Sequence, residues 1–205
     1  MEPTVSLTQG DALIAVDAQR DFFNGGALAQ TNAEQVILSL NRAFGIFEKA
    51  GLLIFVTRLL NSPDDPRFQA GGRRWPPHCI VGTRGAEFAP SLRLPATAHL
   101  ISKVSQQNEG ISSLGFQGTE LPALLKSTRM RRLFLGGFIK DDALADLVRI
   151  GVATGYELFL LQDALTVIAP SGHAAQPSDL KGIEAVFVRT GELAVRIANG
   201  ERGAA

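Results

Sequence analysis

The sequence predicts an α/β protein in which a six-stranded, mainly parallel β-sheet lies between two layers of helices. Short apolar runs recur along the chain, and amphipathic stretches with helical spacing lie between them. Alternation of this kind is typical of a parallel sheet with helices on both faces. The sequence contains no internal repeat, low-complexity tract or domain linker, so residues 1–205 are predicted to form a single domain.

The six predicted strands are short apolar runs, the pattern of strands buried on both faces. They are expected at residues 12–16, 52–57, 100–102, 133–135, 158–161 and 185–189.

The predicted helices have apolar residues on one face. In the first, Asn32 and Gln35 form a capping-box pattern at the start, and Gly51 is expected to end the helix. Further helices are expected just before Lys126, from about residue 141 to 153, and from 192 to 199. The apolar face of the first helix is formed by Val36, Ile37, Leu40, Ala43, Phe44 and Phe47.

Composition and charge exclude several classes of function. Lys and Arg number 20, as do Asp and Glu, so no net charge attracts nucleic acid or an anionic membrane. Cys79 is the only cysteine, which excludes an internal disulfide. No stretch has the pattern of a signal peptide or a membrane span. We therefore expect a cytoplasmic protein whose partner is a small molecule.

Two charged residues stand at the ends of predicted strands. In parallel sheets, ligands bind at the carboxyl ends of the strands, where loops and helix starts converge. Asp17 directly follows the first predicted strand, and Lys103 ends the third. Taken alone, such a carboxylate often only caps a turn, and most lysines are solvated. The irregular stretch from residue 59 to 98 is too long for a simple connection, so we expect it to help build the site.

Four blocks spread over most of the chain resemble the isochorismatase-like cysteine hydrolases, and nicotinamidases and pyrazinamidases in particular. The blocks are ALIAVDAQRDFFNGGALA (12–29), WPPHCIVGTRGAEF (75–88), ISKV (101–104) and GFIKDDALADLVRIGVATGYEL (137–158). The second is highly specific, and the third is weak alone but falls in the right order. The resemblance implies the Rossmann-like α/β fold of that superfamily.

The resemblance also implies the parts of a catalytic site. Amidases of this superfamily use an Asp to take the proton of a Cys thiol, which attacks the substrate carbonyl, together with a Lys. Asp17 and Lys103 match the Asp and the Lys, but Ala143 stands at the position of the Cys. A cis peptide is expected within residues 138–140. The ligand-binding or oxyanion region is expected at Phe22, Trp75, Ile139 and Lys140.

Nicotinamidases also hold a metal through Asp and His residues. Here the family's Asp-x-His pair falls on Leu59 and Asn61, which leaves His78 as a lone match. Because a stable site needs about three or four protein ligands, no metal and no other cofactor is expected.

Other candidate residues have simpler interpretations. Cys79 follows His78, but neighbours in an extended segment point in opposite directions, and free cysteines are commonly just buried. Asp141 and Asp142 fall in the first turn of a predicted helix, where carboxylates favour the positive end of the dipole. We interpret both as helix-start residues.

Replacement of the nucleophile limits the possible functions. Removing a nucleophile that acts with its base costs roughly a million-fold in rate, so amide hydrolysis through residue 143 is excluded. One hypothesis is an enzyme of the isochorismatase type, in which Asp17 is a general acid and Lys103 holds a carboxylate. Arg73, Arg74 or Lys140 would then be a second cation.

Two non-catalytic hypotheses remain open beside it. In one, the protein is an inactive homologue of nicotinamidase that keeps a pocket for an aromatic or amide-like ligand. In the other, it is a structural subunit of a hetero-oligomer. Members of this superfamily commonly assemble, so a homo-oligomer is expected.

Overall fold

The computed structural model describes residues 4–69, 75–104, 118–168, 174–175 and 184–195. Within them, the main sheet has seven strands, in the order β4-β3-β2-β5-β6-β7 with β8 beside β6. All neighbouring strands run parallel except β7, so the predicted fold class is confirmed. The strands are β2 (Asp11–Val16), β3 (Leu53–Leu60), β4 (His99–Val104), β5 (Arg132–Lys140), β6 (Glu157–Ile168), β7 (Ala174–Ala175) and β8 (Val186–Val188).

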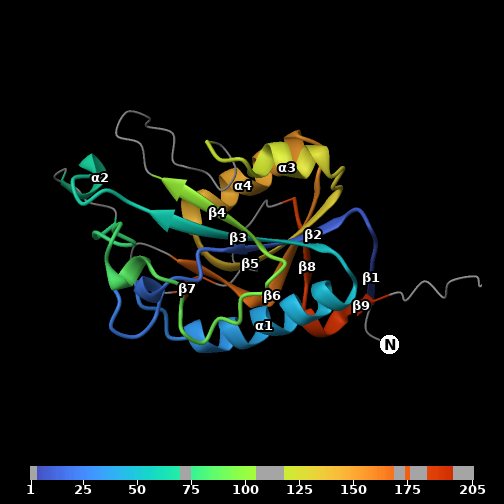
Figure 1. Ribbon diagram of the computed structural model, residues 1–205, viewed down its shortest axis with the longest axis horizontal. Coiled ribbons are helices and arrows are strands. Elements are labelled where there is room, and N and C mark those ends of the chain that lie inside the picture. Colours follow the sequence, from blue (N-terminus) through green and yellow to red (C-terminus); the bar gives the residue numbers. More distant parts are fainter. Residues whose placement is uncertain (1–3, 70–74, 105–117, 169–173, 176–183, 196–205) are drawn as a thin grey trace, which may run out of the picture.

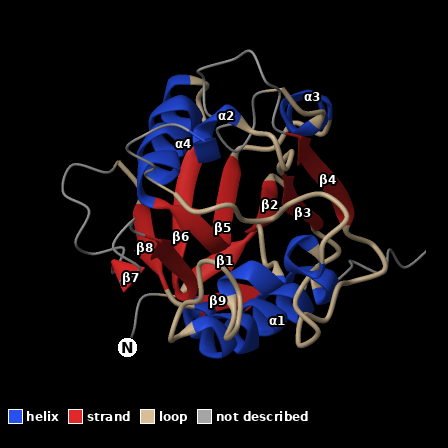
Figure 2. Cartoon of the chain, turned by 90° about the vertical axis from the view of Figure 1, so that its left-hand side faces the viewer, coloured by secondary structure: helices blue, strands red, loops and turns tan. Residues whose placement is uncertain are grey.

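Helices cover both faces of this sheet. The long helix α1 (Ala33–Lys49) lies along one face, and α3 (Leu121–Ser127) and α4 (Asp141–Ala153) lie on the other (Figures 1 and 2). A core cluster fills each interface, with Phe44 and Phe47 of α1 in one and Leu147 of α4 in the other. The short helix α2 (Pro66–Gln69) follows β3. Among the described helices, none has both the length and the apolar character needed to cross a bilayer.

Single-turn 3₁₀ helices and a second small sheet complete the described fold. The 3₁₀ turns are η1 (Arg20–Phe22), η2 (Arg84–Ala86) and η4 (Thr190–Glu192). The second sheet pairs β1 (Val5–Leu7) with β9 (Leu193–Val195) in parallel. The predicted helix from 192 to 199 is therefore wrong for the residues in β9, because they form backbone bonds with β1. Residues 196–199 lie outside the described part of the chain.

The two ends of α1 differ in how well they were predicted. Gly51 has φ +65° just after the helix, which confirms its predicted role. Asn32 is the N-cap residue, but its side chain makes no capping bond to the helix. Its Oδ1 instead accepts a hydrogen bond from the Thr166 hydroxyl at 2.9 Å, so the predicted capping box is wrong.

Candidate functional site

A cavity of about 30 Å³ lies at the carboxyl ends of β2, β3, β4 and β5. The arrowheads of β3 and β4 point toward this end of the sheet in Figure 1. A polar cavity of this size holds about two water molecules. Its lining is formed by Val16, Asp17, Phe22, Leu59, Lys103, Phe138, Ile139, Lys140, Ala143 and Leu147.

The cavity brings together residues that lie far apart in the sequence. Asp17, Lys103 and Ala143 line it together, so their predicted convergence at one end of the sheet is confirmed. Phe22, Ile139 and Lys140 line it as well. The chemical roles assigned to these side chains stay predictions. Arg73 and Arg74, the other candidate cations, lie outside the described residues.

Asp17 and Lys103 form a buried ion pair in the lining. Lys103 Nζ donates to Asp17 Oδ2 at 2.5 Å, and both residues are 6% exposed. Asp17 Oδ1 accepts a second bond, of 2.6 Å, from the Thr57 hydroxyl on β3. Both oxygens of the Asp17 carboxyl group are therefore engaged, one by an ammonium and the other by a hydroxyl.

The backbone at the end of β2 is strained where it presents this carboxylate. Asp17 has φ +49°, a conformation that non-glycine residues rarely adopt. Its backbone N–H still bonds to the Thr57 carbonyl at 3.2 Å. Such strain persists where the surrounding structure enforces it, and it concentrates at functional sites.

A glycine lets β5 pass close to β2 at the cavity. Gly137 lies opposite Val16 and has φ +108°. A Cβ atom at this position would lie 2.1 Å from the Val16 carbonyl oxygen, so only glycine fits. Beyond it, β5 continues to Lys140 in register with β6, and α4 starts at Asp141.

The prediction of a cis peptide within residues 138–140 is wrong. The described residues contain no cis peptide bond, and Phe138, Ile139 and Lys140 pair with Thr166, Val167 and Ile168 of β6. Residues 138–140 are thus the last part of a regular strand, and no turn interrupts the strand there.

Trp75 does not line the cavity but lies beside one of its cations. The Nζ atom of Lys140 lies 5.5 Å from the centroid of the partly buried Trp75 ring, within cation–π range. The loop that contains Trp75 therefore reaches the end of β5.

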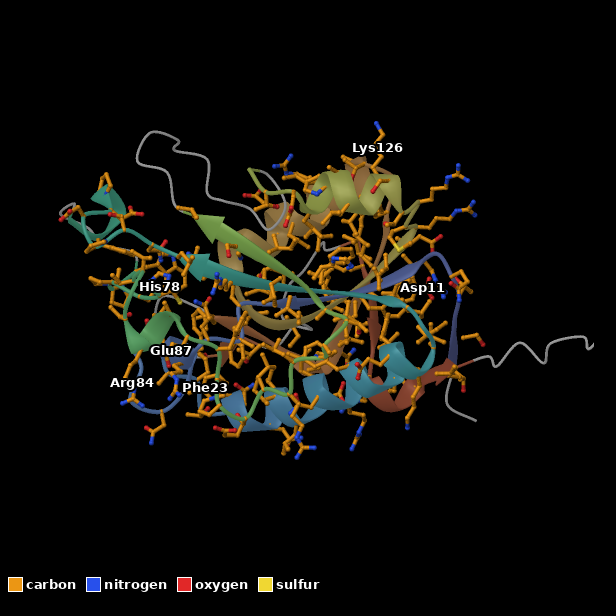
Figure 3. The ribbon with its side chains drawn as sticks, viewed as in Figure 1. Asp11, Phe23, His78, Arg84, Glu87 and Lys126 are labelled. Carbon is orange, nitrogen blue, oxygen red and sulfur yellow. The ribbon has the colours of Figure 1, made fainter. Side chains whose placement is uncertain are left out.

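His78 makes contacts that hold its loop against the rest of the fold. Its Nδ1 lies 2.7 Å from the Pro76 carbonyl oxygen, and its ring packs edge-on against Phe68. Asn61 Nδ2 donates to the His78 carbonyl at 2.7 Å, which fastens this loop to the end of β3. Figure 3 shows His78 at this end of the molecule.

These residues do not fit a metal site. Leu59 is apolar and lines the cavity, and the Asn61 amide is engaged by the backbone of His78. In the described part of the chain, no group of three or more His, Cys, Asp or Glu side chains could hold an ion. That the protein binds no metal stays a prediction.

Cys79 is buried and poorly suited to be a nucleophile. Burial raises the pKa of its thiol far above the ordinary value, and the negative charges of Asp17 and Asp21 raise it further, against the smaller opposing effect of Lys140 and Lys103. Since the thiolate is the reactive form, this thiol is inert at neutral pH.

Three polar residues that support the site were not predicted. Besides Thr57, the buried Gln19 side chain donates to the Leu59 and Ala86 carbonyls, each at 2.8 Å. Asp21 Oδ2 accepts from the Cys79 N–H at 2.6 Å. Of the three, only Thr57 had a sequence signal. It ends a predicted strand, which places it near the end of β2.

Comparison with known proteins agrees with this arrangement. A model of the isochorismatase domain matches residues 11–192. The chain belongs to the isochorismatase domain family. It is 32% identical to the nicotinamidase/pyrazinamidase of Mycobacterium tuberculosis, over 70% of this chain and 81% of that protein. It is 27% identical to the nicotinamidase of Acinetobacter baylyi, over 87% of this chain and 92% of that protein.

The fold of this isochorismatase-family chain is also similar to solved structures. The pyrazinamidase of Pyrococcus horikoshii, solved in complex with zinc, superimposes with a TM-score of 0.74 and 30% identity. The match covers 88% of this chain and 99% of that one.

Proposed function

We propose that this isochorismatase-family protein binds a small aromatic or amide-like molecule and does not hydrolyse it through a cysteine nucleophile. The observation that carries the proposal is the position of Ala143, which borders the cavity together with the Asp17–Lys103 pair. A methyl group has neither a lone pair nor a proton to lose. The class of ligand is supported by the nicotinamidases and pyrazinamidases that the chain resembles.

Cysteine chemistry has no other source in the chain. The one thiol, that of Cys79, is buried, and the same burial holds it in the protonated form. The residual catalysis of a site without its nucleophile falls roughly a million-fold below that of the complete one. Position 143 is the one that the family pattern assigns to the nucleophile.

Hydrolysis with Asp17 as a general acid is the second candidate. It is favoured by the burial of Asp17 and Lys103 next to the cavity, where a substrate would meet them. Against it, both Asp17 oxygens accept hydrogen bonds, so the carboxylate has no proton to donate until Lys103 moves away. Binding without catalysis therefore agrees better with the geometry.

A ligand screen with matched variants tests the proposal. Thermal unfolding is measured with aromatic amides, aromatic acids and isochorismate, and the same mixtures are assayed for hydrolysis. We expect stabilisation by at least one compound, with no hydrolysis. Ala143→Leu fills the cavity and should abolish the stabilisation, whereas Ala145→Leu, at an exposed position of the same helix, should not.

Two results would decide against the proposal. Hydrolysis that Asp17→Asn removes would establish the acid-catalysed enzyme instead. Absence of binding by every compound, at concentrations that saturate a nicotinamidase, would mean that the cavity holds no ligand of this class.

The variant Ala143→Cys tests whether the pocket still aligns an amide substrate. We expect Ala143→Cys to regain little nicotinamidase activity, because the amide must also be aligned, and alignment supplies several kcal/mol of the barrier. Alkylation of the introduced cysteine should nevertheless be fast near neutral pH, since a nearby ammonium favours the thiolate. Strong hydrolysis of nicotinamide by this variant would show that the pocket has kept its old substrate.

A further inference from the structure

A second cavity lies at the start of α1, apart from the one around Asp17. Its volume of about 330 Å³ is within the range of small-molecule sites. Its walls come from the loop after η1 and from the first turn of α1, and it shares no lining residue with the first cavity. Figure 3 shows Phe23, one of the lining residues, beside the start of α1. The apolar part of the lining is formed by Phe23, Ala29 and Ala33.

Gln30 brings an acceptor without a donor to this cavity. It lines the cavity and is only 4% exposed. Its Nε2 donates to the Leu28 carbonyl at 2.8 Å and to the Ala29 carbonyl at 3.3 Å, which fixes the orientation of the amide. Its Oε1 accepts no hydrogen bond from the part of the chain that the structure describes. Since a buried acceptor without a donor is unfavourable, a ligand that donates to Oε1 is favoured here.

The first turn of α1 adds a negative side chain and backbone donors. Glu34 lines the cavity at an exposed position, and its carboxylate and the Gln30 Oε1 atom both suit an ammonium group. The N–H groups of Glu34 and Gln35 have no acceptor among the described residues. The Asn32 side chain, which could cap them, bonds to Thr166 instead. Free N–H groups at the start of a helix favour an anionic group.

We propose that this second cavity binds a free α-amino acid with an apolar side chain. The ammonium of the ligand meets Gln30 Oε1 and the Glu34 carboxylate, and its carboxylate meets the start of α1. Its side chain lies against Phe23, Ala29 and Ala33. A ligand with only one of the two charged groups would leave the other part of the site unused. The inference goes beyond the proposed function, because it concerns a separate site.

Three ligands with the same apolar body test this inference. Calorimetry measures the dissociation constants of leucine, of isocaproate, which lacks the ammonium, and of isoamylamine, which lacks the carboxylate. The wild type should bind leucine about tenfold or more tightly than either analogue, because each analogue loses a set of charge-assisted hydrogen bonds.

Matched variants place the ligand in this cavity. Ala29→Phe fills part of the space and should abolish leucine binding, whereas Ala27→Phe, at an exposed position of the same loop outside the lining, should not. Glu34→Gln should reduce the preference for leucine over isocaproate. Glu48→Gln, at an exposed position near the other end of α1 with the same change in net charge, should leave that preference unchanged.

The buried acceptor has its own variant. Gln30→Met removes Oε1 and should weaken leucine binding about tenfold while leaving isocaproate binding unchanged. An equal effect on both ligands would contradict recognition of the ammonium by Gln30. If this variant does not fold, Glu34→Gln reports on the same ammonium, and a full preference for leucine in that variant would contradict the proposal.

Other outcomes would overturn the proposal as a whole. They are equal binding of leucine and isocaproate by the wild type, no leucine binding at tens of millimolar, and unchanged leucine binding in a folded Ala29→Phe. Ala143→Leu fills only the cavity around Asp17 and should leave leucine binding intact. Loss of leucine binding in that variant would place the amino acid in the first cavity and contradict a second site.

Discussion

Asp11 and Asp17 stand at the two ends of the same strand, β2, and each pairs with a cation, but their surroundings differ. At the amino end, Asp11 Oδ1 accepts from Arg132 Nε at 2.7 Å and from the Thr8 hydroxyl at 3.1 Å. Oδ2 accepts from the Thr8 N–H at 2.7 Å and from Arg132 Nη2. Arg132 also donates to the Ser6 carbonyl. Each oxygen of the Asp11 carboxylate thus accepts two hydrogen bonds from residues of the fold.

At the carboxyl end, Asp17 accepts one bond on each oxygen, borders a cavity and has a positive φ. Figure 3 shows Asp11 and His78 at opposite ends of the molecule. The difference shows how two buried carboxylates of one strand, each paired with a cation, can be distinguished. A carboxylate whose bonds are all made by its own fold stabilises that fold, whereas one beside a cavity on a strained backbone keeps acceptor capacity for a ligand.

The largest expected effect is at the Asp11 end. Asp11→Ala should lower the free energy of unfolding by about 2–3 kcal/mol, because it leaves the partly buried Arg132 guanidinium and the Thr8 N–H without their acceptor. Chemical denaturation measures the loss. A loss below about 1 kcal/mol is the value expected of a solvated surface ion pair. It would contradict the structural role assigned to Asp11.

The buried thiol at the site end predicts an intermediate, pH-dependent effect. Because burial raises the pKa of Cys79 in the folded state, only the unfolded chain ionises as the pH rises past about 8.5. The free energy of unfolding should therefore not depend on this thiol below that pH, and should fall above it by up to about 1.4 kcal/mol per pH unit. Cys79→Ala should lose this slope. An equal slope in both proteins would mean that Cys79 is not the group responsible.

The smallest effect is expected when the Asp17–Lys103 pair is replaced as a whole. Asp17→Asn tolerates the positive φ, and Lys103→Met keeps most of the length of the side chain without its charge. The double variant should unfold within about 1 kcal/mol of the wild type, as replaced buried ion pairs often do. Asp11→Asn with Arg132→Met should lose clearly more, because the bond to the Ser6 carbonyl disappears. Equal losses would contradict the assignment of the two pairs to different roles.

The sequence predicted which segments form the parallel strands, but not how far each strand extends. The strand predicted at residues 133–135 is too short, because β5 continues through Gly136 and Gly137 to Lys140. Similarly, β6 continues past Gln162 and Asp163, where its register with β5 shifts. The strands β1 and β9 are too short to give a periodic pattern, and they form only because each pairs with the other.

The site, too, could be predicted from the sequence only in part. Asp17 and Lys103 were recognisable because parallel strands bring their carboxyl ends together and because the family pattern fits both positions. Gln19 and Thr57 were not, since their roles consist of hydrogen bonds to residues about 40 positions away. The cis peptide was carried over from the family, and the pairing of β5 with β6 shows that this chain does not have it.

The β1–β9 sheet has a consequence for the order of folding. Its register joins Val5 to Leu193, from opposite ends of the described chain. Closing so long a loop is entropically costly, and such contacts form late, after more local pairings have shortened the effective loop. A fluorescence donor at Val5 and an acceptor at Leu193 would therefore report the last step of folding, separately from the parallel sheet that carries the cavity.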